Sequence, residues 1–142
     1  MALYRTFRKI RLQDVDAAGI VFFPKFLEYC HDAYFEFLEQ EGLDLAAGIS
    51  SGPYILPLVH AEADFRAPLR FGDEVEVIVA TAVAGQSSYT VRYLVRKRAG
   101  QTLCCEASTV HAAIERTTFK PMKELPERVC AILKLQYPQA KP

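Results

Sequence analysis

Hydrophobic positions in the first third of the chain change their period near Pro24. Residues 4–12 alternate between apolar and charged side chains, as a β-strand does. From Pro24 onward, apolar residues recur every three or four positions and charged residues occupy the opposite side. This pattern is typical of an amphipathic helix of about four or five turns. Because proline is favoured at a first helical position and glycine just past a helix end, we expect a helix between Pro24 and Gly42.

The rest of the chain has mainly a period of two. Residues 43–53, rich in Gly and Ser, predict a loop, and the tail "FKPMKELPERVCAILKLQYP" predicts a basic loop and one short helix. Between them, short turns separate four alternating segments, residues 59–67, 74–79, 89–96 and 102–115. Short turns make neighbouring strands antiparallel. The sequence therefore predicts an α+β domain in which a five-stranded antiparallel sheet wraps one long central helix. The uncovered sheet face and edges predict an oligomer.

Composition narrows the class of protein. The chain has 142 residues, is 51% hydrophobic and has a formal net charge of zero. We find no repeat or linker, so residues 1–142 are expected to form a single domain. The zero balance offers no basic field for nucleic acid or for a membrane surface. The start lacks a signal-like apolar run, and no segment approaches the roughly 18 apolar residues of a membrane span, which favours a cytoplasmic protein. The four cysteines lack CxxC spacing and are expected to be reduced, buried thiols.

Candidate chemistry begins at the stretch "DVDAAGIVFF", which precedes the predicted helix. Asp14 and Asp16 are residue types common in turns, and on type alone a turn role is favoured. However, the apolar residues 20–23 are expected to wall a carboxylate, while the nearby helix end carries positive charge. These two effects shift a carboxyl pKa in opposite directions. Such a setting suits a nucleophile or a general base.

The other candidates have competing interpretations. His31 lies at the border of the apolar helix stripe, either as an inert boundary residue or as a ligand contact. His60 shares a strand face with Glu62, Asp64 and Arg66, which a solvated or subunit-facing surface explains more simply than a metal site. No HxH or HxxE spacing supports zinc, so we expect no metal. There is no GxSxG elbow and no glycine-rich phosphate loop. Lys120 lies in a cationic spot that is either a solvated loop or a contact for a nucleotide phosphate.

The stretch "DVDAAGIVFFPKFLEYCHDAYFEFL" resembles the signature of the hotdog-fold 4-hydroxybenzoyl-CoA thioesterase family. The resemblance continues through "LPLVHAEADFRAPLRFGDEVEV" and covers nearly the whole chain. Within that family, "CHDAYFEFL" and "LPLVHAEADF" are more similar to the 1,4-dihydroxy-2-naphthoyl-CoA thioesterases of phylloquinone and menaquinone synthesis. The resemblance implies a thioester hydrolase that needs no cofactor, since coenzyme A is part of its substrate.

The resemblance also implies roles for individual residues. Asp16 is expected to attack the thioester carbonyl or to activate a water that does so, and Asp14 to be supporting or structural. The backbone N–H of Phe23 is expected to polarise the carbonyl. Many bacterial relatives carry a histidine at the position of Phe23, and its replacement by an aromatic ring favours aromatic acyl groups. The related hydratases have a histidine where this chain has Val21, which argues against hydration of an enoyl-CoA.

The remaining expectations concern substrate and partners. His31 and His60, with Val59 beside the latter, are expected to bind the acyl group, and either histidine could meet a ring hydroxyl. Lys120 is the first choice for the phosphates of coenzyme A, followed by Arg92 and Arg70. The expected assembly is a homotetramer built from dimers. Two alternatives stay open: a thioesterase for 4-hydroxybenzoyl-CoA or other acyl-CoA or acyl-carrier-protein substrates, and a non-catalytic acyl-CoA-binding module, against which the retained Asp16 argues.

Overall fold

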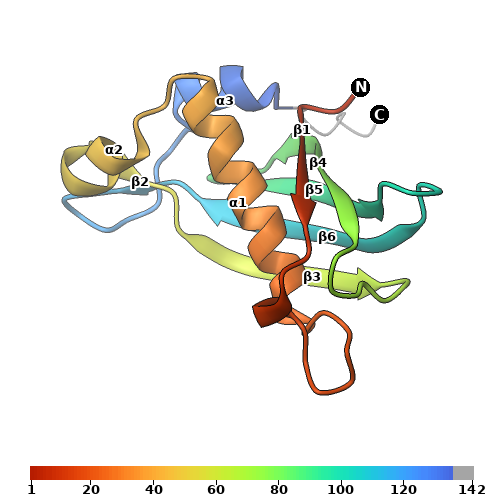
Figure 1. The fold of residues 1–142 in the computed structure, drawn as a ribbon. Helices are drawn as coiled ribbons and strands as arrows, with labels where there is room; N and C mark the ends of the chain where they lie inside the picture. The colour runs from red at the N-terminus through yellow and green to blue at the C-terminus, as the bar shows by residue number, and fades with distance from the viewer. Residues whose placement is uncertain (136–142) are drawn as a thin grey trace.

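The computed structural model describes residues 1–135 and has two layers, a helix on a sheet (Figure 1). The five-stranded antiparallel sheet has the order β1-β4-β5-β6-β3. Its strands are β1 (Tyr4–Lys9), β4 (Glu74–Ala84), β5 (Ser88–Lys97), β6 (Leu103–Ala112) and β3 (Leu58–Phe65). The long helix α1 (Pro24–Gln40) lies across one face of this sheet. The predicted α+β hotdog architecture is confirmed.

Helix α1 forms where its periodicity predicts. Pro24 occupies the start of the helix, and Gly42 follows its end with a φ of 88°, a left-handed conformation that glycine adopts without strain. One face of the helix is buried against the sheet through Phe26, Tyr29, Cys30, Ala33, Tyr34, Phe37 and Leu38. Each large apolar side chain in such a core contributes roughly 1.5–3 kcal/mol of transfer free energy. Packing of this stripe fixes the direction of α1 over the strands.

The sheet supplies the opposite wall of the core. Val75, Val77 and Val79 of β4 are fully buried, and Val79 pairs with Tyr93 of β5, whose side chain is also buried. At the far edge, β3 pairs with β6 only, and all its residues except Ala63 are exposed. These exposed positions include Leu58, Val59 and Phe65. The edge strand β3 therefore presents both unpaired backbone groups and apolar side chains.

Several details differ from the sequence predictions, among them the strand predicted over 74–79, which continues to Ala84 as β4. Residues 43–53 are not a plain loop, because α2 (Leu45–Ser51) forms there, with the Asp44 side chain accepting the Ala47 N–H at 3.0 Å. The first strand ends at Lys9, and the 3-10 turn η1 (Leu12–Asp14) follows. The predicted last strand is divided into β6 and β7 (Ile114–Glu115), which pairs with β2 (Tyr54–Ile55). The predicted strand over 59–67 runs from Leu58 to Phe65 instead.

The tail contains the expected short helix, α3 (Glu127–Leu133), and residues 136–138 of the predicted segment lie outside the described residues. Within residues 1–135, no helix combines the length and the apolar character that crossing a membrane requires.

Candidate active site

The two aspartates flank a tight turn that leads into α1. Val15 and Val21 form an antiparallel bridge, and the Asp16 N–H donates to the Ile20 carbonyl at 2.9 Å. The Gly19 N–H donates back to the Asp16 carbonyl at 3.0 Å, and Gly19 has a φ of 81°, so a residue without a Cβ is favoured there. In Figure 1 this loop projects from the lower edge of the molecule. Residues 15–21 thus form a compact hairpin in which Asp16 follows the Val15–Val21 bridge and precedes the tip at residues 17–19.

The Asp16 carboxylate faces solvent in the single chain. Its Oδ1 accepts the Ala18 N–H at 2.8 Å, the geometry of an Asx turn. Phe22 and Phe23, which were expected to wall it, are themselves exposed. The prediction of a partly desolvated Asp16 is therefore wrong for the isolated chain, because the turn directs its side chain away from the core.

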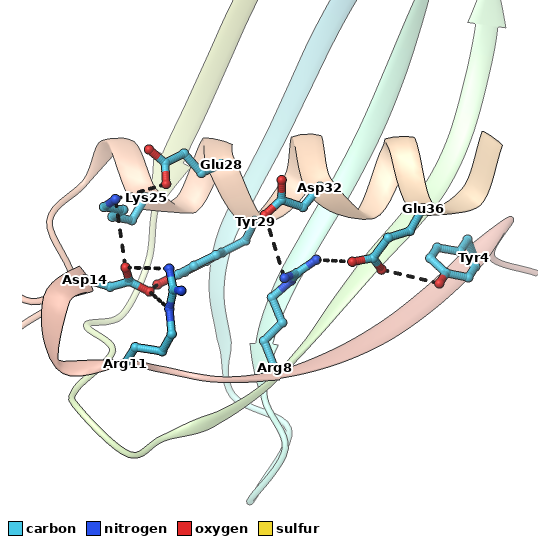
Figure 2. A network of polar contacts seen from close by, with 9 residues as sticks. All are labelled: Tyr4, Arg8, Arg11, Asp14, Lys25, Glu28, Tyr29, Asp32 and Glu36. Atoms are coloured by element: carbon cyan, nitrogen blue, oxygen red, sulfur yellow. Dashed lines mark hydrogen bonds and ion pairs between the residues drawn. The ribbon is translucent and has the colours of Figure 1, made fainter. Parts of the chain in front are cut away.

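Asp14 is the buried member of the pair, with 1% of its surface exposed (Figure 2). The Tyr29 hydroxyl donates to its Oδ2 at 2.8 Å, and Arg11 approaches its Oδ1 at 3.3 Å. Lys25 of α1 lies 3.9 Å from the same Oδ1. Burial alone raises the pKa of Asp14, but the Tyr29 hydrogen bond, with Arg11 and Lys25, outweighs it. The pKa of Asp14 therefore lies below its usual value, and the group is an ionised, fully engaged acceptor.

A free backbone donor lies at the start of α1. Phe23 precedes Pro24 as the helix N-cap residue, and its N–H donates to no acceptor within residues 1–135. Unpaired N–H groups at a helix start attract negative charge. Such a group can stabilise the oxyanion that forms when a carbonyl is attacked. The exposed Asp16 and this free N–H belong to the same short connection between η1 and α1.

An apolar groove of about 380 Å³ adjoins this connection. Its aromatic members lie edge to face: the ring centroids of Phe23 and Phe65 are 6.1 Å apart, and those of Phe26 and Phe65 are 5.3 Å apart. Rings in this arrangement can pack against a further ring. The groove is lined by Ile20, Val21, Phe23, Phe26, Phe65, Arg66, Ala67 and Pro68.

The structure does not bring the two candidate histidines together within one chain. His31 projects from α1 onto the edge of Phe35, with ring centroids 4.2 Å apart, and burial lowers its pKa. On β3, Ala63 packs against the core, so the alternate residues His60 and Glu62 face the other side of the sheet. There Glu62 accepts from Ser108 at 3.1 Å and lies 3.5 Å from the His60 ring. Val59 is displaced by an irregularity in the β3–β6 pairing.

The candidate cations are also dispersed. Arg70 lies beside the active turn, because its backbone bridges Ile20. Arg92 is exposed on β5, opposite Ser108 of β6, on the same sheet face as His60. Lys120 lies in the exposed loop after β7 and hydrogen-bonds to Glu115 through its backbone. Of these three predicted cations, all of them described residues, only Arg70 adjoins the Asp16 turn within one chain.

Sequence reasoning missed a buried polar cluster beneath α1. The Thr109 hydroxyl lies 2.8 Å from the Tyr93 hydroxyl and 2.9 Å from His111 Nε2, and the His111 ring stacks against Tyr34 and Tyr89. Burial lowers the pKa of His111 to about 4, although the nearby Leu56 backbone opposes this shift. No hydrogen bond of standard geometry reaches His111 Nδ1 within the described residues. The inward positions of β5 and β6 could have indicated this cluster, but it does not line the groove.

The part of the chain that the structure describes contains no group of three or more His, Cys, Asp or Glu side chains able to hold a metal. The groups described at the Asp16 turn are a carboxylate, a backbone donor and an apolar groove.

Comparison with known proteins places this arrangement in a family. The profile of the thioesterase-like superfamily matches residues 10–133. A 1,4-dihydroxy-2-naphthoyl-CoA hydrolase of Rippkaea orientalis is 39% identical over 112 residues, which cover 78% of this chain and 81% of that protein. A hydrolase of the same name from Synechococcus elongatus is 36% identical over 130 residues, with 91% and 93% covered. The crystal structure of a 1,4-dihydroxy-2-naphthoyl-CoA thioesterase from Synechocystis superposes with a TM-score of 0.86 at 34% identity, covering 92% of this chain and 95% of that one. The chain belongs to the thioesterase-like superfamily.

Proposed function

We propose that this protein is an acyl-CoA thioesterase that hydrolyses 1,4-dihydroxy-2-naphthoyl-CoA to 1,4-dihydroxy-2-naphthoate and coenzyme A. The observation that carries the proposal is the placement of the Asp16 carboxylate and the free Phe23 N–H on one short connection, next to an apolar groove with aromatic walls. The names and coverage of the relatives support this substrate. Hydrolysis of this compound belongs to phylloquinone and menaquinone biosynthesis, and we assign the protein to the cytoplasm.

The chemistry follows from these groups. Asp16 attacks the thioester carbonyl, or removes a proton from a water that attacks it. The carbonyl oxygen then becomes an oxyanion, which the Phe23 N–H stabilises by roughly 2.7–4 kcal/mol relative to a site without the donor. Collapse of this intermediate expels the thiolate of coenzyme A, which takes up a proton. In the nucleophilic route, water then hydrolyses the resulting acyl anhydride of Asp16 and regenerates the carboxylate.

The groove suits the acyl group because Phe23, Phe26 and Phe65 offer faces and edges to a planar ring. Of the three cations predicted to contact coenzyme A, Arg70 is the best placed within the same chain, since its backbone bridges Ile20. We assign no further cofactor, and we treat residues 1–142 as one domain.

A second copy of the chain would complete the site. The β3 edge exposes Leu58, Val59 and Phe65, so an antiparallel pairing of two β3 strands would cover this apolar surface. In that pairing the Phe65 end of one strand lies near the Val59 end of the other. The second copy would then supply the missing wall around Asp16 and bring Val59, His31 and Lys120 as candidate contacts, whereas Arg92 stays on the opposite face of the joined sheet. We propose a homotetramer built from such dimers, and light scattering of the purified protein at the monomer mass would contradict it.

The test of the proposed function is release of free thiol from a panel of acyl-CoAs. The panel contains 1,4-dihydroxy-2-naphthoyl-CoA, 4-hydroxybenzoyl-CoA and a series of aliphatic acyl-CoAs, each with wild type and Asp16→Asn. We expect the highest kcat/KM with the naphthoyl ester and loss of that activity in Asp16→Asn. Preference for 4-hydroxybenzoyl or aliphatic esters would overturn the substrate, and binding without any turnover would indicate a non-catalytic module.

A further inference from the structure

The proposed reaction does not use the carboxylate of the buried Asp14. Among residues 1–135, Asp14 is the only carboxylate that is fully buried. Burying an ionised carboxylate costs free energy unless its oxygens are satisfied. Here they are satisfied by a hydroxyl and two cations, an arrangement that holds the side chain in one position. A buried carboxylate this close in sequence to Asp16 is therefore a candidate for holding the reactive residue in place.

The contacts of Asp14 join the hairpin to α1. Its side chain accepts from Tyr29, which lies on the buried face of α1, and it approaches Lys25 in the first turn of that helix (Figure 2). Its backbone carbonyl accepts the Phe22 N–H at 2.9 Å. Asp14 therefore contacts the helix itself and also the residue immediately before Phe23.

The Asp16 carboxylate has no comparable tie to the helix. Its Oδ1 accepts only the Ala18 N–H among the described residues, and the backbone bonds of Asp16 with Gly19 and Ile20 also lie within the turn. The hairpin is attached to the rest of the protein through Asp14 on one side and through the Val21 N–H, which donates to the Leu69 carbonyl at 2.8 Å, on the other. Because only Val15 separates Asp14 from Asp16, a shift of Asp14 moves the reactive turn relative to α1.

We propose that Asp14 and Tyr29 are positioning residues, whose buried hydrogen bond sets the distance between the Asp16 carboxylate and the Phe23 N–H. This inference rests on the proposed function, because it concerns the same reaction. Burial and the contact with Asp14 raise the pKa of Tyr29, so its hydroxyl remains a donor. Tyr29 does not line the groove, and only 5% of its surface is exposed. It therefore acts through Asp14 and not on the substrate.

The first experiment compares Tyr29→Phe with Tyr4→Phe. Both substitutions remove a tyrosine hydroxyl that donates to a carboxylate. The difference is that Tyr4 contacts Glu36, which lies far along α1 from the Asp16 turn (Figure 2). With 1,4-dihydroxy-2-naphthoyl-CoA, we expect Tyr29→Phe to lower kcat roughly 10- to 100-fold, because small displacements of reacting groups cost that much. KM should stay within about twofold, and Tyr4→Phe should keep kcat within about twofold. Equal kcat values for the two variants would overturn the inference.

The second experiment is a double-mutant cycle with Asp16→Asn. If Tyr29 acts by placing Asp16, adding Tyr29→Phe to Asp16→Asn should change the residual rate by less than about twofold. If Tyr29→Phe lowered the rate of the Asp16→Asn variant by the same factor as it lowers the wild-type rate, its effect would not depend on Asp16. That result would indicate a general loosening of the fold and would overturn the inference. Should Tyr29→Phe fail to fold, as judged by circular dichroism, the same cycle is run with Asp14→Asn.

The two proposals fail separately. An Asp16→Asn variant with wild-type turnover would overturn the proposed mechanism. An inactive Asp16→Asn together with normal kcat in Tyr29→Phe would leave that mechanism standing and remove only the positioning role.

Discussion

Asp14 and Asp16 are the same residue type two positions apart, yet their surroundings are opposite. Asp14 is buried, ionised and engaged by Tyr29, Arg11 and Lys25, whereas Asp16 is exposed and bonds only within its own turn. A carboxylate whose oxygens are occupied by a hydroxyl and two cations is a poor nucleophile, because reaction would require breaking those contacts. An exposed carboxylate on the same short connection as a free backbone N–H is available for chemistry. The comparison supports our proposal that Asp16 takes part in the reaction and that Asp14 has a positioning role.

Apart from replacement of Asp16 itself, the largest effect expected on the reactive side concerns the Phe23 N–H. Phe23→Pro deletes this donor, and the φ of −52° at this position is compatible with proline. We expect kcat to fall roughly 10²- to 10³-fold, the effect of removing one oxyanion donor. Phe23→Ala is the matched control, since it also loses the ring but keeps the N–H. Equal rates for the proline and alanine variants would remove the backbone donor from the mechanism.

A smaller effect is expected from the groove. Phe65→Ala removes the ring that contacts both Phe23 and Phe26. We expect kcat/KM for the naphthoyl ester to fall about 10- to 100-fold, because an apolar pocket contact contributes roughly 1–3 kcal/mol of discrimination. The rate with acetyl-CoA serves as the reference and should change much less. A uniform loss across both substrates would show that Phe65 does not select the ring.

On the buried side, the expected effect is on stability. Asp14→Ala leaves the Tyr29 hydroxyl without its acceptor, and we expect the free energy of unfolding in urea to fall by about 1–3 kcal/mol. Asp16→Asn should change the same quantity by less than about 0.5 kcal/mol, as exposed substitutions usually do. Equal destabilisation by the two variants would contradict the difference that we describe between the buried Asp14 and the exposed Asp16.

The smallest expected effect is on the pH dependence of the free energy of unfolding. The pKa of Asp14 is lower in the folded protein than the value of about 3.9 in an unfolded chain. The stability from its ionised form is therefore fully present above about pH 4 and is lost as the pH falls through the folded-state pKa. The difference in unfolding free energy between wild type and Asp14→Asn should be constant from about pH 7 to 5 and shrink below about pH 4. A difference that grows on acidification would contradict the assigned pKa direction.

The sequence predicted the fold well because it depends on periodicity. The apolar stripe from Phe26 to Leu38 and the alternating strands identify the helix and the sheet that it covers. The motif around Asp16 and Gly19 likewise identified the turn. Helix α2 was missed because its Gly and Ser residues are typical of loops and none of its side chains is buried. The β2–β7 pair was missed because two-residue strands distant in sequence leave no periodic signal.

The environments of the two aspartates could not be predicted from the sequence. Both lie among the same neighbours, and the residue that buries Asp14, Tyr29, lies 15 positions further along the chain. The alternation in β3 likewise predicted that His60 and Glu62 share one face of the strand. It did not reveal that this face lies on the side of the sheet away from α1, the helix that carries His31. These facts depend on tertiary contacts, which no local pattern encodes.

The central claim is that the exposed aspartate performs the chemistry and the buried one holds it in place. The most direct measurement is kcat for Asp16→Asn and Asp14→Asn, side by side, by thiol release from saturating 1,4-dihydroxy-2-naphthoyl-CoA. We expect a loss of roughly 10³-fold or more for Asp16→Asn and a clearly smaller loss for folded Asp14→Asn. An active Asp16→Asn alongside an inactive, folded Asp14→Asn would contradict it and assign the reaction to the buried carboxylate.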